Sequence, residues 1–405
     1  MGPPGRPFGP GFDVNELMRM LQSPGPVNWE IARKIAAETS TTDEEDARGA
    51  SEPEPVEPGD RDQIADIAQA AQTHIADATG LSHALTVPID IVDRAEWANR
   101  TLGGLEPVVL ALAQAISPQA ETPPAEPPPP APADSPFAGT PFAAFGPDIA
   151  SSLAPLAIGW MAGSLAGLLA QFALGQYDLP LPLANEPRLA FVASNIAAFG
   201  RDWSLPTADL HFALALREVV HGAQRSVPWV RERLVRNSSA YVARYELRLD
   251  ALAQQFESFS SFDISDPATL ENFELPDPGT LLETMQTPAQ QPILEDLQRF
   301  AAVLEGYADT VVDTIGEPLI PSLPQIEEAL RRHRVDRGHA AGVVDRMLGL
   351  ELGRDHYEQG HAFCRGVVER AGLDGLDRLW ESETMLPTPN ELAAPGLWLA
   401  RIEIR

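Results

Sequence analysis

Apolar residues recur along most of this chain at intervals of three and four, the spacing that places them on one face of a helix. The pattern is clear from Asp62 to about residue 117, with Ile64, Ile67 and Ile75 as examples. Further helices are predicted over 13–22, 28–40, 149–174, 207–227, 229–258, 294–311, 322–334 and 338–372. Alternation typical of a strand is confined to the last residues, LWLARIEIR. The sequence therefore predicts a mainly α fold with little β structure.

Two of the predicted helices begin at residues that can cap them. Asn28 can cap the helix predicted over 28–40, and Thr207 or Asp209 can cap the helix that runs toward Pro228. The side-chain oxygens of these residue types accept hydrogen bonds from N–H groups of the first helical turn. Proline bends or ends a helix because it lacks the N–H group and its ring crowds the preceding turn.

Composition divides the chain into four parts. Residues 1–61 form a flexible arm with short helices and an acidic spacer, and residues 62–117 form an N-terminal helical part. Residues 118–147 contain PPAEPPPP and have almost no periodicity, which is typical of a polyproline II linker. Residues 148–405 contain the remaining helices and are predicted to form the main core.

Residues 149–174 contain no charged side chain and allow two interpretations. About 20 apolar residues suffice to cross a membrane, and Gly159, Gly163 and Gly167 stand four apart, as in closely packed membrane helices. However, the segment contains a proline and has no basic flanking residue to anchor it. We favour a helix buried on all sides in a large core, whose glycines let neighbours approach closely. A membrane span is the less favoured alternative.

The charge balance limits the kinds of partner. The 405 residues include 58 acidic and 29 basic side chains, for a formal net charge of -29. This excludes nucleic-acid binding, which needs a cationic surface to displace counterions from phosphates, and it disfavours anionic lipid surfaces. The single cysteine, Cys364, cannot form an internal disulfide, and the N-terminal residues contain no apolar signal segment. The protein is therefore expected in the cytoplasm.

One local pattern, REVVH at 217–221, resembles the HExxH sequence of zinc hydrolases. In that sequence, two histidines one helical turn apart bind the metal, and the glutamate takes a proton from the bound water. Here Glu218 and His221 stand in register, whereas Arg217 replaces the first histidine. Glu305 and Asp309 are four residues apart on a later predicted helix. That spacing suits a third zinc ligand and an aspartate that orients a histidine.

Together with several longer blocks, these motifs resemble the actinobacterial zincin-like metallopeptidases of the second type, a family labelled as candidate hydrolases. The similar blocks are GPVNWEIARKIA near the start, VPWVRERL after His221, LEGYADTVVD at 304–313 and the long block at 348–392. The resemblance covers about 13–37 and 62–400 without the linkers. It implies a zincin-like helical core with an active-site helix and a later helix that carries a glutamate.

The resemblance also implies roles for individual residues. His221 matches the second zinc histidine and Glu218 matches the general base. Glu305 is a candidate third ligand, with Asp309 in the supporting position. Tyr307 stands where close relatives have histidine. The arginine that precedes Glu218 indicates an arginine-bearing branch of the family.

Arg217 cannot take over the role of a zinc ligand. Its guanidinium group has no lone pair to offer and stays protonated. It would also repel a nearby dication by roughly 4 kcal/mol or more at an effective dielectric constant of about 20. Glu218 and Glu305 are costly to bury without a positive charge beside them. We therefore predict that Arg217 forms an ion pair with Glu305, or with Glu218, in the space of the lost metal.

Three functional hypotheses follow. The favoured one is a non-catalytic pseudoenzyme that needs no cofactor and binds a protein or peptide partner or acts as a scaffold. The alternative is a zinc-dependent metallopeptidase or hydrolase, with zinc as its cofactor, whose site is completed by an unidentified ligand. The third is a protein anchored in the membrane through residues 149–174.

Overall fold

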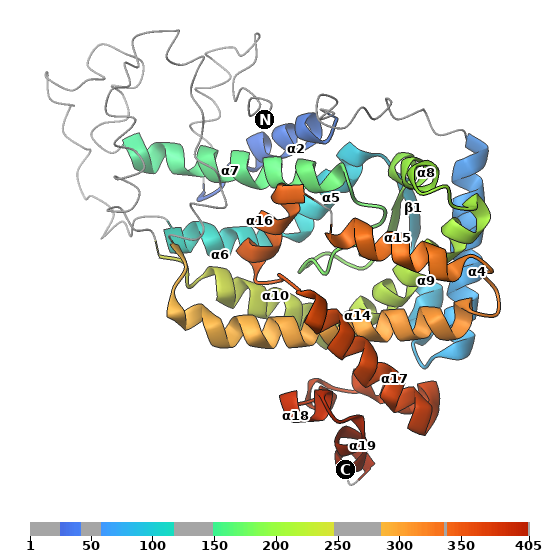
Figure 1. Cartoon of the computed structure of the whole chain (residues 1–405). Coiled ribbons are helices and arrows are strands. Elements are labelled where there is room, and N and C mark those ends of the chain that lie inside the picture. Colours follow the sequence, from blue (N-terminus) through green and yellow to red (C-terminus); the bar gives the residue numbers. More distant parts are fainter. Residues whose placement is uncertain (1–24, 42–57, 117–148, 247–284, 336–337, 404–405) are drawn as a thin grey trace, which may run out of the picture.

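The computed structural model describes residues 25–41, 58–116, 149–246, 285–335 and 338–403 (Figure 1). Most of them are helical, which confirms the predicted mainly α fold. The first helices are α2 (Trp29–Thr41), α4 (Pro58–Ala78), α5 (Arg94–Gly104), α6 (Glu106–Ile116), α7 (Ile149–Ala170), α8 (Ala193–Asp202), α9 (Thr207–Ser226) and α10 (Pro228–Val242). The later ones are α14 (Gln291–Gly316), α15 (Leu323–Val335), α16 (Gly338–Leu348), α17 (Arg354–Asp377), α18 (Pro389–Leu392) and α19 (Pro395–Glu403).

Helix α9 lies at the centre of the described structure. Every residue from Ala213 to Arg225 is buried, because α4, α10, α14 and α15 all pack against this helix. A helix that is covered on several sides must bury its polar residues together with its apolar ones, and buried polar residues need partners. The partners of the charged residues on α9 therefore define the site that this helix can form.

Helices on both sides of the predicted linker share one hydrophobic core. Helix α4 packs against α9, and α5 packs against α7. Residues 117–148 lie outside the described residues, so the division into parts at 62–117, 118–147 and 148–405 stays a prediction.

The strands of the described residues lie far from where the sequence indicated them. Strands β1 (Ile89–Val92) and β2 (Leu189–Val192) form a short parallel pair, with Ile89 opposite Leu189. The strand predicted from LWLARIEIR is wrong, since residues 397–403 belong to α19. Its buried residues Trp398 and Ile402 are four apart, so the apolar spacing that folding uses there is helical.

Helices α2 and α7 pack so closely that their backbones touch. A Cβ atom added at Gly159 would overlap the backbone oxygen of Asn28, just before α2, and one at Gly163 would overlap that of Ala32 on α2. The predicted role of these glycines is thus confirmed, but burial on all sides does not hold near the start of α7, where Ala157 is exposed. Helix α7 contacts α2, α5, α6 and α16, and each residue from Ile158 to Ala170 is buried or half-buried. No helix in the described ranges combines the length and the apolar character that a membrane crossing needs.

Several helix ends differ from the predicted ones. The Asn28 cap is confirmed, since its Oδ1 accepts from the Ile31 N–H at 3.0 Å. Helix α9 begins at Thr207 without a side-chain cap, because the Asp209 carboxylate instead accepts from the N–H and the hydroxyl of Ser322.

The single helix predicted over 338–372 is divided between α16 and α17, where Gly349 adopts a positive φ of 70°. Helix α10 ends at Val242, before the predicted residue 258, and the helix predicted over 13–22 lies outside the described residues.

Candidate functional site

Arg217 joins α9 to α14 through two carboxylates. Its Nη2 donates to Glu305 Oε2, and its Nη1 donates to Asp309 Oδ1 at 2.5 Å. Arg217 is 5% exposed and Glu305 is 1% exposed. The predicted ion pair of Arg217 with Glu305 is therefore present, whereas no pair with Glu218 occurs within the described residues. Burial favours the neutral form of Arg217, but the two carboxylates outweigh that effect and raise its pKa above the ordinary value.

His221, one helical turn after Arg217, presents a lone pair to the same site. Gln224 donates from Nε2 to the Leu304 carbonyl at 3.1 Å, so its Oε1 is the atom that faces His221 Nδ1, at 2.9 Å. Since an amide oxygen can only accept, His221 Nδ1 carries the hydrogen and Nε2 carries the lone pair. That nitrogen lies 3.7 Å from Glu305 Oε1. Two ligand-type atoms thus face one another beside the guanidinium.

The charge state of His221 is set by its surroundings. The imidazole is completely buried, and burial lowers its pKa well below the ordinary value, an effect that the cations of Arg217 and Arg225 strengthen. The ring is therefore neutral at physiological pH. Arg225 approaches Nδ1 to 3.3 Å, and its Nη1 has the His221 carbonyl as acceptor at 3.4 Å.

Glu218 serves a different contact from the one that its motif suggests. Its Oε1 accepts from the Tyr177 N–H at 2.9 Å, and its Oε2 accepts from the Gln176 N–H at 3.1 Å. Gly175 precedes these donors and leaves no room for a Cβ atom beside the carboxylate. The 175–177 segment also pairs with β2, where the Gln176 N–H donates to the Ala190 carbonyl. Glu218 thus attaches this segment to α9.

The burial of Glu218 predicts that the stability of the folded protein depends on pH. Burial raises its pKa from 4.5 to about 8. Between these values the folded protein retains a proton that the unfolded chain has lost, so this group's contribution to stability falls as the pH rises from 4.5 to 8. We expect Glu218→Gln to reduce the loss of unfolding free energy between about pH 6 and about pH 7.5 by about 2 kcal/mol.

Urea unfolding of both proteins at both pH values measures this difference. A constant cost of the glutamine cancels, because only the change with pH is compared. Equal pH dependence in the two proteins would show that Glu218 is ionised in the folded state throughout.

Tyr307 does not enter the site. It lies two residues after Glu305, on the opposite side of α14, and its hydroxyl donates to Asp377 Oδ1 at the end of α17. Its ring is completely buried and meets Trp380 edge to face, with 5.0 Å between the ring centres. The tyrosine therefore connects α14 to α17 rather than altering the environment of His221.

The structure brings together four of the six predicted site residues, namely Arg217, His221, Glu305 and Asp309. Two residues that contact His221 from the next helical turn, Gln224 and Arg225, were not among the predicted site residues. Their positions three and four residues after the histidine place them on its face of the helix, and this spacing was the signal available.

These residues do not fit a tetrahedral zinc ion. Such an ion needs three neutral or anionic donors and an open position. Only His221 Nε2 and Glu305 Oε1 face one another, while Arg217 brings a cation with its hydrogens to Glu305. In the described part of the chain, no group of three or more His, Cys, Asp or Glu residues is arranged to hold a metal ion.

Most of the chain is similar to a known protein family and to a solved structure. Residues 27–399 match the family described as "Zincin-like metallopeptidase". A crystal structure from Chloroflexus aurantiacus, described as that of a candidate hydrolase with a novel fold, is similar at a TM-score of 0.57 and 25% sequence identity. The similarity covers 94% of this chain and 99% of that chain. No curated protein matches the sequence.

Proposed function

The chain belongs to the family of zincin-like metallopeptidases, and from this premise we propose that its zinc site has become a buried ion pair and that it acts by binding rather than by hydrolysis. In this proposal the protein is a pseudoenzyme of an arginine-bearing branch. Its partner is a protein or peptide, and the helical core is the scaffold that presents the binding surface.

The observation that carries this proposal is the position of the Arg217 guanidinium. It takes the helix position of the first zinc ligand and holds Glu305 and Asp309, a candidate ligand and its neighbour. A zinc ion bound to His221 Nε2 and Glu305 Oε1 would lie beside a fixed cation that already holds the other oxygen of Glu305. The proposal thus assigns to Arg217 the charge compensation that a metal supplies in zinc-containing sites.

The binding of Glu218 to the 175–177 segment supports the same proposal. A general base must have a lone pair directed at the proton that it removes. Both Glu218 oxygens accept backbone hydrogen bonds, and the residue is 4% exposed. Glu218 is therefore a positioning residue for this segment.

A single substitution tests the proposal directly. Arg217→His completes an HExxH sequence, in which the introduced imidazole stands one helical turn before His221, with Glu305 near that second histidine. We expect the variant to purify with about one zinc per chain. The unaltered protein and Arg217→Met, which removes the cation without adding a ligand, should both lack stoichiometric zinc. Elemental analysis by mass spectrometry after purification without chelator gives the metal content.

The opposite result would restore the alternative hypothesis. If the unaltered protein contains stoichiometric zinc that His221→Ala removes, the site holds a metal despite Arg217. A casein cleavage assay on the same samples separates metal binding from turnover. Zinc-dependent cleavage by the unaltered protein would contradict the binding role.

A further inference from the structure

We propose that a pocket between the end of α4, the start of α10 and the end of α17 binds the guanidinium group of an arginine side chain or of a related small molecule. The pocket has a volume of about 400 Å³, within the range of small-ligand sites, which is roughly 300–1,000 Å³. It is lined by Gly80, Leu81, Val227, Pro228, Asp374, Asp377, Arg378, Trp380 and Glu381. This site shares no residue with the cluster of Arg217, His221, Glu305 and Asp309 (the Arg217 cluster), and its proposal does not depend on the absence of zinc there.

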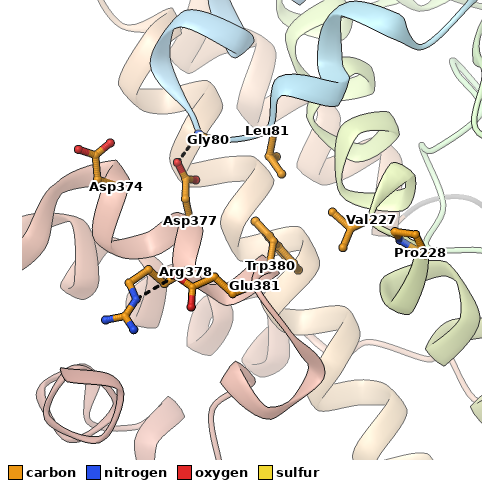
Figure 2. Close-up of a pocket in the computed structure, with 9 residues that line it drawn as sticks. All are labelled: Gly80, Leu81, Val227, Pro228, Asp374, Asp377, Arg378, Trp380 and Glu381. Carbon is orange, nitrogen blue, oxygen red and sulfur yellow. Dashed lines mark hydrogen bonds and ion pairs between the residues drawn. The ribbon is translucent and has the colours of Figure 1, made fainter. Parts of the chain in front are cut away.

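Asp377 is the anionic centre of the pocket. Its Oδ1 accepts from the Tyr307 hydroxyl, and its Oδ2 accepts from the Gly80 N–H at 2.6 Å (Figure 2). Both donors are neutral, and no basic group of the described residues forms an ion pair with this carboxylate. Partial burial raises the pKa of Asp377, the direction expected for a carboxylate that lacks a cationic partner. A cation bound in the pocket would supply that partner.

The basic residue of the pocket does not fill this role. Arg378 donates from Nε to Glu381 Oε1 at 3.2 Å and from Nη2 to the Ile402 carbonyl at 3.1 Å. Figure 2 shows this pair directed away from Asp377. Arg378 and Glu381 compensate each other, and Asp374 is an exposed carboxylate on the same rim. The balance of charge in the pocket is therefore negative.

The remaining walls suit a side chain with an apolar stem. Leu81, Val227 and Pro228 supply aliphatic surface, and Trp380 supplies an aromatic ring that lies between Val227 and Asp377 in the view of Figure 2. Trp380 is held in place by Trp229, whose Nε1 donates to the Trp380 carbonyl at 3.1 Å. The apolar stem of a long cationic side chain can pack along such a wall while the charged group at its end meets the carboxylate.

Among organic cations, the guanidinium group fits this arrangement better than an ammonium group. Each oxygen of Asp377 already accepts one hydrogen bond and keeps one acceptor position. A planar guanidinium offers two parallel N–H groups to such a carboxylate, and it packs flat against aromatic rings. An ammonium group offers a point charge without this match.

The test compares two blocked amino acids that differ in charge but hardly in shape. N-acetyl-arginine methylamide should bind the full-length protein in isothermal titration calorimetry. N-acetyl-citrulline methylamide, in which a neutral urea replaces the guanidinium, should bind at least about ten-fold more weakly. Asp377→Asn should weaken the arginine probe by about ten-fold, and Asp374→Asn, which alters an exposed carboxylate, by much less.

Two further probes identify the source of the guanidinium. Tighter binding of a peptide that contains arginine than of the blocked residue indicates a protein partner. Tighter binding of agmatine indicates a free small molecule. Equal binding of the arginine and citrulline probes, or no saturable binding of the arginine probe, would overturn the proposal. Because the probe comparison uses the unaltered protein, it holds even if Asp377→Asn fails to fold.

Discussion

Arg217→Met is expected to lower the free energy of unfolding by roughly 3–5 kcal/mol. The methionine keeps most of the aliphatic volume of arginine but removes the cation that holds Glu305 and Asp309. Glu305 is 1% exposed, so its charge cannot be solvated by water and becomes an uncompensated buried charge. Urea unfolding followed by circular dichroism measures the loss.

Arg225→Met is the matched control, because Arg225 lies on the same helix and is 3% exposed. No carboxylate in the described part of the chain pairs with Arg225, whose guanidinium lies over the Tyr177 ring at 4.9 Å from its centre. Its removal loses a cation–π contact and the hydrogen bond to the His221 carbonyl but leaves no buried anion, so we expect a change within about 1 kcal/mol. If both variants lose equal stability, the cost of Arg217→Met comes from packing and not from charge.

A double variant isolates the pairwise interaction. In an Arg217→Met, Glu305→Gln protein, neither charge of the pair remains, and much of the stability lost on Arg217→Met should return. A double variant as unstable as the single one would show that Glu305 does not depend on Arg217.

The pairing of Arg217 with Glu305 could be predicted from the sequence because two strong constraints act together. The helical repeat fixes which residues share a face, and a buried carboxylate requires a compensating charge. The Asn28 cap could be predicted for a similar reason, since donor and acceptor are three residues apart in the chain. Local spacing and charge balance are properties that a single sequence displays.

The partners of Glu218 and Tyr307 could not be predicted in this way. Glu218 accepts from backbone N–H groups that are 41 and 42 residues away in the chain, and every residue except proline offers such a donor. Tyr307 contacts Asp377 from the opposite side of α14, and the packing of α17 against α14 determines this partner. The four-residue strands β1 and β2 are likewise too short to display a period.

The crossing of α14 and α17 connects the Arg217 cluster to the Asp377 pocket, and two glycines make it possible. Gly306 lies between Glu305 and Tyr307, and it faces Gly360 of α17. A Cβ atom at Gly360 would overlap the Ala302 carbonyl, and one at Gly306 would overlap the Gly360 backbone. Backbone atoms cannot move aside as a flexible side chain can, so the helices must separate to admit a methyl group.

Gly360→Ala should therefore destabilise the protein by about 3 kcal/mol, although alanine favours helix formation over glycine. Gly103→Ala in α5 provides the control, because a Cβ atom there meets nothing within 4 Å. It should stabilise the protein by about 0.5–1 kcal/mol. The same substitution is thus expected to have opposite signs at the two sites in urea unfolding.

Separation of α14 from α17 should also be visible at Trp380, which packs on Tyr307 across this interface. We expect Gly360→Ala to change the near-ultraviolet circular dichroism of the folded protein and to weaken binding of the arginine probe, since the Tyr307–Asp377 hydrogen bond spans the same crossing. A Gly360→Ala protein with unaltered stability and an unaltered spectrum would mean that the two helices do not meet at these glycines. The Tyr307–Asp377 link would then have to be maintained by another contact.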